Sequence, residues 1–155
     1  MSSKPWSVPT PLENFKPGDW FANRIELSLS GLHRPRRAGI GGTIRNGSDS
    51  IVLSGVYEDD VDLGDVVWYV GHGGRDAKTG RQIADQTLDR YNLALMRSYE
   101  TGRPLRLIRG ATLQNQFAPE TGYRYEGLYR VVEAERIVGK SGFRVWMFRL
   151  VQLAP

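Results

Sequence analysis

Apolar and polar residues alternate or cluster in short stretches that predict a chain built mainly of strands. Ile25, Leu27 and Leu29 alternate with polar residues, as in a half-buried strand, and this pattern stops at Ser30-Gly31. Short apolar runs without such alternation are typical of buried strands. These further predicted strands are residues 51–57, 65–71, 105–108, 128–132 and 143–151.

One segment has helical periodicity. Ala84, Leu88, Tyr91 and Leu95 follow one another at spacings of four, three and four, so the pattern predicts a helix over 82–99. Thr101-Gly102 and Pro104 supply the expected stop. Strands gathered around one principal helix, without strand–helix–strand alternation, indicate an α+β fold whose curved sheet approaches a barrel.

The segments between these elements have distinctive compositions. Residues 1–17 contain Pro5, Pro9, Pro11 and Pro17 and predict an irregular lead-in, because proline disrupts helices and central strands. Residues 33–42 are rich in glycine and basic residues and are expected to project from the surface. An acidic turn is expected between the strands at 51–57 and 65–71, and a second glycine-rich loop at 71–76.

Length and composition favour a single globular domain over residues 18–155. The chain has 155 residues, of which 40% are hydrophobic, which is enough for one core. No apolar run approaches the roughly 18–20 residues of a membrane span, and Met1–Thr10 is too short of apolar residues for a secretory signal. The absence of cysteine excludes disulfides, thiolate metal sites and a cysteine nucleophile. We therefore expect an intracellular protein with no membrane partner.

The basic residues point weakly to a polyanionic partner. The net charge is +4, and 17 of the 21 basic residues are arginine, whose planar guanidinium suits phosphate and guanine edges. A GC-rich genome would also favour arginine over lysine, so composition alone leaves both explanations open.

The strongest candidate chemistry lies around the acidic turn. Tyr57 precedes Glu58, Asp59 and Asp60, and Tyr69 lies twelve residues after Tyr57 in the next predicted strand. If the strands are neighbours, two aromatic faces and a carboxylate share one end of the sheet, which is what an extrahelical cytosine requires. A solvated acidic turn formed by residues 58–65 is the competing interpretation, and a divalent-metal site is a weaker one.

Basic loops flank this cluster in the sequence. Extrusion of a base leaves a gap and phosphates that a protein must fill and hold, although an ordinary charged surface explains any one of these side chains as well. The candidate phosphate and groove contacts are Arg34, Arg36, Arg37, Arg75, Lys78 and Arg81.

Catalytic arrangements find little support in the sequence. Asp49, Ser50 and Ser54 have no histidine at a diagnostic position, although a spatial triad remains open. His33 and His72 alone, without cysteine, make a zinc site or a histidine–metal nuclease centre hard to assemble. His72 is either a polar contact to a ligand or a loop residue facing water. We expect no metal and no cofactor.

The chain resembles the SRA domain, also called the YDG domain, of readers of methylated DNA and of bacterial modification-dependent restriction proteins. The resemblance extends from about Gly18 to Leu150. The motifs that carry it are residues 31–35, 38–40, 54–64, 69–76, 92–95, 101–104, 140–143 and 145–146.

The resemblance implies a PUA-like curved β-barrel with flanking helices and a pocket for a flipped 5-methylcytosine. It places the base between Tyr57 and Tyr69, with Asp60 at its polar edge. Backbone groups around Gly55, Val56 and Val70 complete the pocket, with Gly71 and His72 at its rim. The loops that enter the DNA grooves match residues 36–38 and 78–82, which adds Gln82 to the candidate contacts.

Three departures from the family pattern limit what the resemblance implies. The motif behind the YDG name reads Tyr125-Glu126-Gly127 here, a change that we expect to be structural. Val70 and His72 replace a threonine and a small hydroxyl residue that are common in the family, which leaves the preferred cytosine modification open. The loops around Arg37 and Gln82 differ from those of animal members, so a preference for hemimethylated sites is not carried over.

The sequence therefore predicts a non-enzymatic module that binds double-stranded DNA containing modified cytosine. Bacterial relatives often use such a domain to guide a nuclease, so a fused or associated nuclease is an expected partner and the nucleoid of the bacterial cytoplasm the expected location. A metal-dependent nucleic-acid hydrolase and an RNA-binding PUA-like module remain as alternatives.

Overall fold

The computed structural model describes residues 14–154, and two helices and a mixed sheet dominate it. The helices are α1 (Arg24–Ser30) and α2 (Arg90–Thr101), and a short 3-10 helix, η2, spans Ala111–Leu113. The strands are β1 (Trp20–Phe21), β2 (Ile40–Thr43), β3 (Gly47–Leu53), β4 (Val61–Asp62), β5 (Val66–Val70), β6 (Leu105–Gly110), β7 (Tyr123–Val138) and β8 (Arg144–Gln152). Most of the expected lead-in, residues 1–13, lies outside the described residues.

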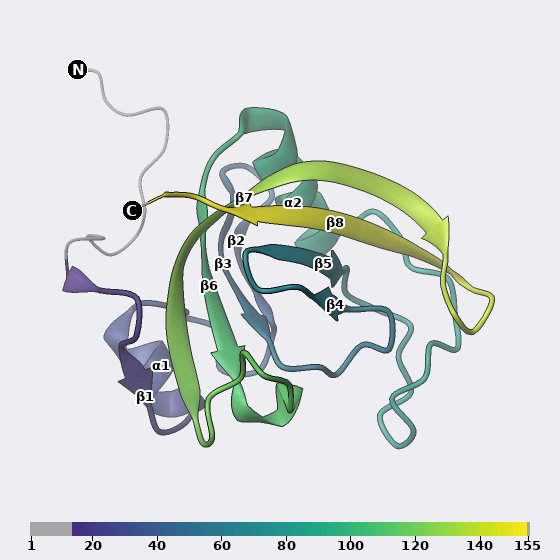
Figure 1. Ribbon diagram of the computed structural model, residues 1–155. Coiled ribbons are helices and arrows are strands. Elements are labelled where there is room, and N and C mark those ends of the chain that lie inside the picture. The colour runs from purple at the N-terminus through teal and green to yellow at the C-terminus, as the bar shows by residue number, and fades with distance from the viewer. Residues whose placement is uncertain (1–13, 155) are drawn as a thin grey trace.

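The strands form one curved sheet in the order β2-β3-β6-β7-β8-β5-β4, and β1 pairs with β7 beside this path. β3 and β6 pair in parallel, whereas the other strand pairs of the described chain are antiparallel. The long β7–β8 hairpin crosses the molecule and projects beyond the sheet (Figure 1). This arrangement confirms the predicted α+β class, but the sheet is open, with β2 and β4 as its edges, and does not close into a barrel.

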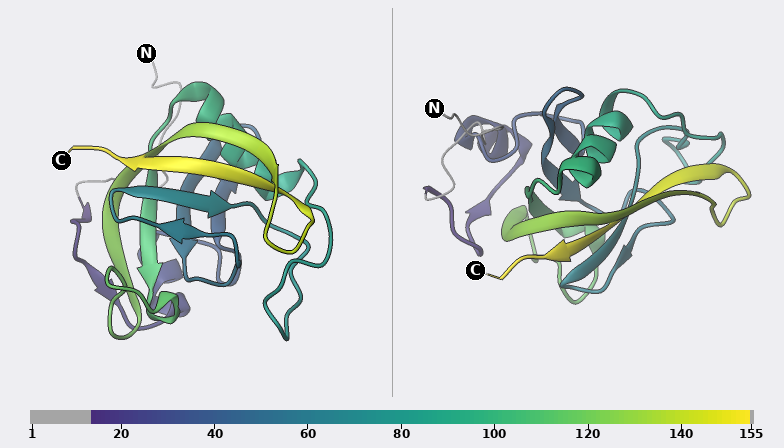
Figure 2. Two further views of the ribbon diagram at one scale, coloured as in Figure 1. Left: turned by 45° about the vertical axis from the view of Figure 1, so that its right-hand side comes forward. Right: turned by 90° about the horizontal axis from the view of Figure 1, so that it is seen from above.

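The two helices cover different parts of the sheet, and Figure 2 shows them well apart. α2 contacts β2, β3 and β7, and its Leu95 joins a core with Leu53, Tyr69 and Phe148. Leu27 of α1 packs with Ile108 in a second cluster. Within residues 14–154, no helix combines the length and the apolar character that a membrane crossing requires.

The predicted strand at 25–29 is wrong, because these residues form α1. The Asn23 side chain accepts a hydrogen bond from the Glu26 N–H, and Gly31 ends the helix in the left-handed conformation at φ 85°. These are standard helix start and stop signals. Only Leu27 of the alternating residues is buried, whereas Ile25 and Leu29 are exposed.

Other boundaries differ from the sequence predictions. The helix expected at 82–99 begins at Arg90, and residues 71–89 form a loop, called the long loop below. The segment expected as a loop at 33–42 contains β2, so that the basic loop comprises residues 33–39. β3 ends at Leu53, and the residues that follow it, 54–60, form the acidic loop.

Candidate functional site

A cavity of about 340 Å³ lies where the acidic loop, the end of β5 and the basic loop meet. Its size falls within the usual range of small-ligand pockets. Seven of the sequence-predicted pocket and contact residues line it on the acidic-loop and β5 side: Val56, Tyr57, Asp60, Tyr69, Val70, Gly71 and His72. Gly55, the eighth predicted pocket residue, lies in sequence between the lining residues Ser54 and Val56 but does not itself line the cavity.

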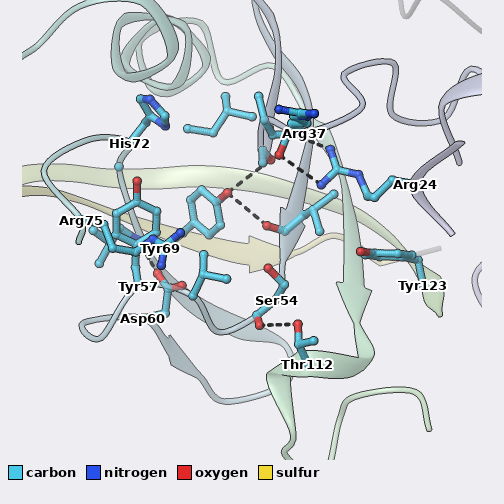
Figure 3. A pocket seen from close by; sticks show the side chains of 17 residues that line it. Arg24, Arg37, Ser54, Tyr57, Asp60, Tyr69, His72, Arg75, Thr112 and Tyr123 are labelled. Carbon is cyan, nitrogen blue, oxygen red and sulfur yellow. Dashed lines mark hydrogen bonds between the residues drawn. The ribbon is translucent and has the colours of Figure 1, made fainter. Parts of the chain in front are cut away.

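Tyr57 and Tyr69 stand on the cavity wall with Asp60 beside them (Figure 3). The β4–β5 pairing brings them together, because it places Val61 opposite Trp68, each next in sequence to one of these wall residues. The Tyr57 hydroxyl accepts a 2.9 Å hydrogen bond from the Gly73 N–H. The Tyr69 hydroxyl lies 3.2 Å from the Val52 carbonyl oxygen and 3.3 Å from that of Gly39. Both rings are therefore fixed through their hydroxyl groups.

Asp60 is held by the strand that carries Tyr69. Its Oδ1 accepts a 2.8 Å hydrogen bond from the Val70 N–H. Burial raises the pKa of Asp60 to about 7, and the neighbouring Asp59 and Asp62 act in the same direction, although the Val70 hydrogen bond opposes them. A carboxyl group with this pKa populates both its charged and its neutral form near neutral pH.

The side chains of Asp59 and Asp62 are buried and hydrogen-bonded within the protein rather than solvated. Asp59 is 6% exposed and its Oδ1 accepts from the Lys140 N–H at 2.9 Å. Asp62 is paired with Arg109, and its side chain is 3% exposed. Among residues 14–154, no three histidine, aspartate or glutamate side chains are grouped closely enough to hold a metal ion.

Arg109 of β6 joins β4 to β7. Its guanidinium contacts both oxygens of Asp62, at 2.8 and 2.7 Å, and Glu126 Oε2 at 2.6 Å. Burial alone would raise the pKa of Asp62, but the hydrogen bonds from Arg109 and Asn115 outweigh it and lower that pKa. Glu126 of the Tyr125-Glu126-Gly127 motif thus makes a buried ion pair, which agrees with a structural role.

The start of the long loop is fixed from α2. Asn92 accepts from the His72 N–H at 2.7 Å and donates to the His72 carbonyl oxygen at 3.0 Å. A Cβ atom on Gly71 would lie 2.5 Å from the Asn92 Oδ1, so this approach requires glycine. The His72 ring meets Tyr91 edge-on at 4.9 Å, and partial burial lowers its pKa. His72 thus presents a mainly neutral imidazole at the rim.

The predicted basic contacts divide into two groups. Arg37 and Arg75 line the cavity, and the Arg75 guanidinium lies 5.7 Å from the centre of the Tyr57 ring. The other four, Arg34, Arg36, Lys78 and Arg81, are exposed on the basic loop and the long loop and do not line the cavity.

Gln82 does not have the exposed position expected of a DNA contact. It is 2% exposed, and its side-chain amide donates to the carbonyl oxygens of Gly73, at 2.8 Å, and Ala84, at 3.0 Å. Its side chain therefore holds the long loop together, and we correct its predicted role accordingly.

Four polar cavity residues were not predicted as site residues from the sequence: Arg24, Ser54, Thr112 and Tyr123. Ser54 was considered only as a nucleophile. Arg24 immediately precedes residues 25–29, which were wrongly predicted as a strand, and η2 and the start of β7 bring Thr112 and Tyr123 in from distant positions. No local pattern marks such long-range neighbours.

A spatial serine–histidine pair does exist, but it is buried. His33 Nδ1 lies 2.7 Å from Ser50 Oγ, and Ser50 Oγ lies 3.1 Å from Asp49 Oδ1. His33 and Ser50 are both 0% exposed, and burial lowers the pKa of His33 to about 3. No substrate can reach this serine, so the pair is structural.

Comparisons of sequence agree with this architecture. The sequence profile of the SAD/SRA domain matches residues 9–154. A UHRF1-like protein of Cryptococcus neoformans is 47% identical over 128 residues, which cover 76% of this chain and 37% of that protein. The E3 ubiquitin-protein ligase UHRF1 of Xenopus laevis is 38% identical over 161 residues, which cover 90% of this chain and 21% of the ligase.

Solved structures give the same answer. The modification-dependent TagI restriction endonuclease superposes with a TM-score of 0.86 at 42% identity, over 97% of this chain and 52% of that one. The SUVH5 SRA bound to fully hydroxymethylated CG DNA superposes with a TM-score of 0.77 at 36% identity, over 97% of this chain and 94% of that one. From its profile match, its relatives and its fold, the chain belongs to the SAD/SRA domain family.

Proposed function

We propose that this chain binds double-stranded DNA containing 5-methylcytosine, or a related modified cytosine, by rotating that base out of the duplex into the cavity. The observation that carries the proposal is the convergence of two tyrosine rings and one carboxyl group, Tyr57, Tyr69 and Asp60, on a single cavity. An extruded base loses its stacking neighbours, and aromatic rings replace them.

Asp60 meets the polar edge of the cytosine in this proposal. Its Oδ1 is engaged by the Val70 N–H, which leaves Oδ2 to accept a hydrogen bond from the exocyclic amine. Because the Val70 N–H is committed to Asp60, backbone groups around Gly55 and Val56 are the candidates for the remaining polar atoms of the base. Gly71 and His72 lie at the rim, where the C5 substituent is distinguished.

The exposed cations hold the DNA backbone. Guanidinium and ammonium groups bind phosphates without reading sequence, and they supply most of the non-specific affinity. We assign this role to Arg34, Arg36, Arg37, Arg75, Lys78 and Arg81.

Several relatives support DNA as the partner. SUVH5 SRA structures contain methylated CHH DNA and hemimethylated CG DNA as well as hydroxymethylated DNA. These complexes favour DNA over the RNA-binding alternative, and the commitment of Asp59, Asp60 and Asp62 to backbone or arginine partners disfavours the metal-dependent hydrolase.

We further propose that residues 18–155 act as one targeting module of a modification-dependent restriction system in a bacterial cytoplasm, at the nucleoid. The likeness to TagI supports this role, and this chain covers only 52% of the TagI chain. In this proposal a fused or associated nuclease performs cleavage, and the module itself recognises DNA without cutting it.

A binding titration tests recognition. We expect the protein to bind a duplex with one 5-methylcytosine more tightly than the same unmodified duplex at physiological salt, because phosphate contacts alone give no discrimination. Fluorescence of 2-aminopurine next to the modified base should rise on saturation, since unstacking relieves its quenching. Equal affinities, or fluorescence that stays at the duplex level, would contradict the proposal. Incubation of the duplex with Mg²⁺ should leave the strands intact.

A further inference from the structure

The backbone carbonyl groups of the basic loop accept several hydrogen bonds from side chains of the protein. Side chains from α1, β5 and the loop itself donate hydrogen bonds to them. The carbonyl oxygens that accept these bonds are those of Arg34, Pro35, Arg37, Ala38 and Gly39. Because a buried carbonyl group without a donor is costly, this set of bonds fixes the path of the loop.

Arg24, the first residue of α1, makes three of these hydrogen bonds. Its Nη2 donates to the carbonyl oxygens of Pro35, at 2.8 Å, and Ala38, at 2.7 Å, and its Nη1 donates to that of Arg37 at 3.3 Å. A planar guanidinium offers several N–H groups in a fixed fork, whereas an ammonium offers one nitrogen. Only arginine can therefore bridge three carbonyl groups in this way.

Two neighbours reinforce the same segment. Ser28 Oγ donates to the Arg34 carbonyl oxygen at 2.7 Å. The buried His33 lies with Nε2 2.9 Å from the Ala38 carbonyl oxygen. Ser28 lies in the last turn of α1 and His33 lies within the loop itself, so the Arg24 fork is the contact that ties the loop to the start of α1.

The braced loop presents three arginine side chains to solvent. Arg34, Arg36 and Arg37 are exposed, and within residues 14–154 none of the three side chains makes a hydrogen bond or an ion pair. The Tyr69 hydroxyl also donates a hydrogen bond to the Gly39 carbonyl oxygen, so one hydrogen-bond network links the cavity wall to the basic loop. Arg24 itself lines the cavity (Figure 3).

We propose that Arg24 is a positioning residue for duplex recognition: its guanidinium holds the basic loop so that Arg34, Arg36 and Arg37 face the DNA before binding. Ordering a flexible loop on binding costs free energy, and a loop ordered in advance avoids that cost. The inference rests on the proposed function for its consequence in DNA binding, but the bracing of the loop is tested without DNA.

Limited trypsin digestion tests the bracing, because Arg36 and Arg37 are themselves cleavage sites. Arg24→Lys keeps the charge but loses the fork, so we expect cleavage after Arg36 and Arg37 to accelerate about tenfold, as when one or two charge-assisted hydrogen bonds are lost. Cleavage after Arg81 in the long loop should keep its wild-type rate. Arg45→Lys, at the exposed turn between β2 and β3, serves as the matched control and should change neither rate.

DNA binding tests the consequence. Arg24→Lys should weaken binding to the methylated duplex about tenfold although the net charge is unchanged, because the loop must be ordered at that moment. Ser28→Ala should also weaken binding to the methylated duplex, by a smaller factor. If Arg24→Lys unfolds at a much lower temperature than wild type, the affinity of Ser28→Ala is the result that tests the bracing.

Each outcome has one meaning. Unchanged cleavage after Arg36 and Arg37 in both variants would overturn the inference, as would faster cleavage with unchanged affinity. Equal wild-type affinity for methylated and unmodified duplexes would instead overturn the proposed function, and the digestion would still decide whether Arg24 braces the loop.

Discussion

At the scale of single residues, the carboxyl group of Asp60 accepts a hydrogen bond but is buried, and burial disfavours its charged form. Burial raises its pKa from 3.8 to about 7, so the folded protein holds this proton more tightly than the unfolded chain. Its contribution to stability is therefore fully present below pH 3.8 and is lost as the pH rises through 7. At neutral and higher pH, the buried Asp60 carboxylate therefore lowers the free energy of unfolding of the protein without DNA.

Asp60→Asn should remove this pH dependence. Relative to wild type, we expect the free energy of unfolding of the variant to rise by about 2 kcal/mol between pH 5 and pH 8.5, as linkage predicts for a raised carboxyl pKa. Urea unfolding at both pH values measures it. Burial lowers the pKa of His33 to about 3, so its titration makes stability rise with pH. His33 is present in both proteins, so this contribution cancels in the difference between their free energies of unfolding.

Asp65→Asn is the matched control, because Asp65 is exposed and lies five residues away in the β4–β5 turn. It should give the wild-type pH dependence. A flat difference between Asp60→Asn and wild type across this pH range would show that the Asp60 carboxyl is already ionised in the folded protein.

Removal of a base contact should lower the discrimination between the two duplexes. Asp60→Ala and Tyr69→Ala should each lower the preference for methylated over unmodified duplex by about 1 to 3 kcal/mol, as expected for a lost base contact or stacking platform. Tyr69→Phe keeps the ring but loses the hydroxyl that faces Gly39 and Val52. It should therefore retain discrimination while its free energy of unfolding falls by about 1 kcal/mol.

Competition titrations with both duplexes measure the preference, and urea unfolding measures stability. If Tyr69→Phe loses as much discrimination as Tyr69→Ala, the ring is not the recognising group.

Residues beside strands were predicted better than residues within loops. Tyr57, Asp60 and Tyr69 lie at or near the ends of neighbouring strands, so spacing alone suggested that they meet. Gln82 could not be predicted, because its amide is satisfied by Gly73 and Ala84 through the course of an irregular loop. The bridging role of Arg24 depends on contacts across 11 to 14 residues, which no periodicity records.

At the scale of elements, α1 shows how capping outweighs alternation. Ile25, Leu27 and Leu29 alternate with polar residues as in a strand. Only Leu27 is buried, however, so the three side chains do not form one buried face. Asn23 and Glu26 mark the helix start and Gly31 its end. These signals are present in the sequence, and in the fold they outweigh the apolar alternation.

Asn23→Ala should destabilise α1. Because the Asn23 side chain accepts from the Glu26 N–H at 2.9 Å, its loss should lower the free energy of unfolding by about 1 kcal/mol. Asn46→Ala in the β2–β3 turn, where the residue is also exposed, should have a much smaller effect. Urea unfolding of the two variants compares them, and equal losses would mean that the cap adds nothing beyond an ordinary surface asparagine.

The long loop shows the opposite case, in which a helical pattern does not form a helix. Leu88 belongs to the predicted periodicity but is exposed, and the helix begins only after Asp89. Gln86 instead bonds across to the Gly71 carbonyl oxygen and accepts from the Trp146 N–H. Hydrogen bonds to Gly71, directly after β5, and to Trp146 of β8 thus outweigh local helix propensity over residues 82–89.

At the scale of the whole molecule, the curved open sheet places distant segments around one cavity. The acidic loop, the end of β5 and the basic loop come from separate parts of the chain and meet at the cavity. The residue pattern predicted the fold class and the meeting of the wall residues Tyr57, Asp60 and Tyr69. It could not predict that the sheet stays open, because closure depends on whether β2 and β4 pair.

The charge distribution should appear in the salt dependence of binding. Each phosphate neutralised by a cation contributes a slope of about −0.9 to the dependence of log K on log salt concentration. Arg36→Ala or Arg37→Ala should therefore weaken binding to methylated and unmodified duplexes alike and reduce the steepness of that slope by about one. The ratio of the two affinities should stay near its wild-type value, because phosphate contacts carry no information about the modification.

Arg130→Ala is the control, since Arg130 is exposed on β7 and does not line the cavity. It should leave both the slope and the affinities unchanged. Titrations between about 50 and 200 mM salt give the slopes, a range over which several phosphate contacts change affinity by orders of magnitude. Equal slopes for wild type and Arg36→Ala would place this side chain away from the phosphates. A loss confined to the methylated duplex would instead make Arg36 part of modification readout, because a contact that neutralises phosphate must weaken both complexes.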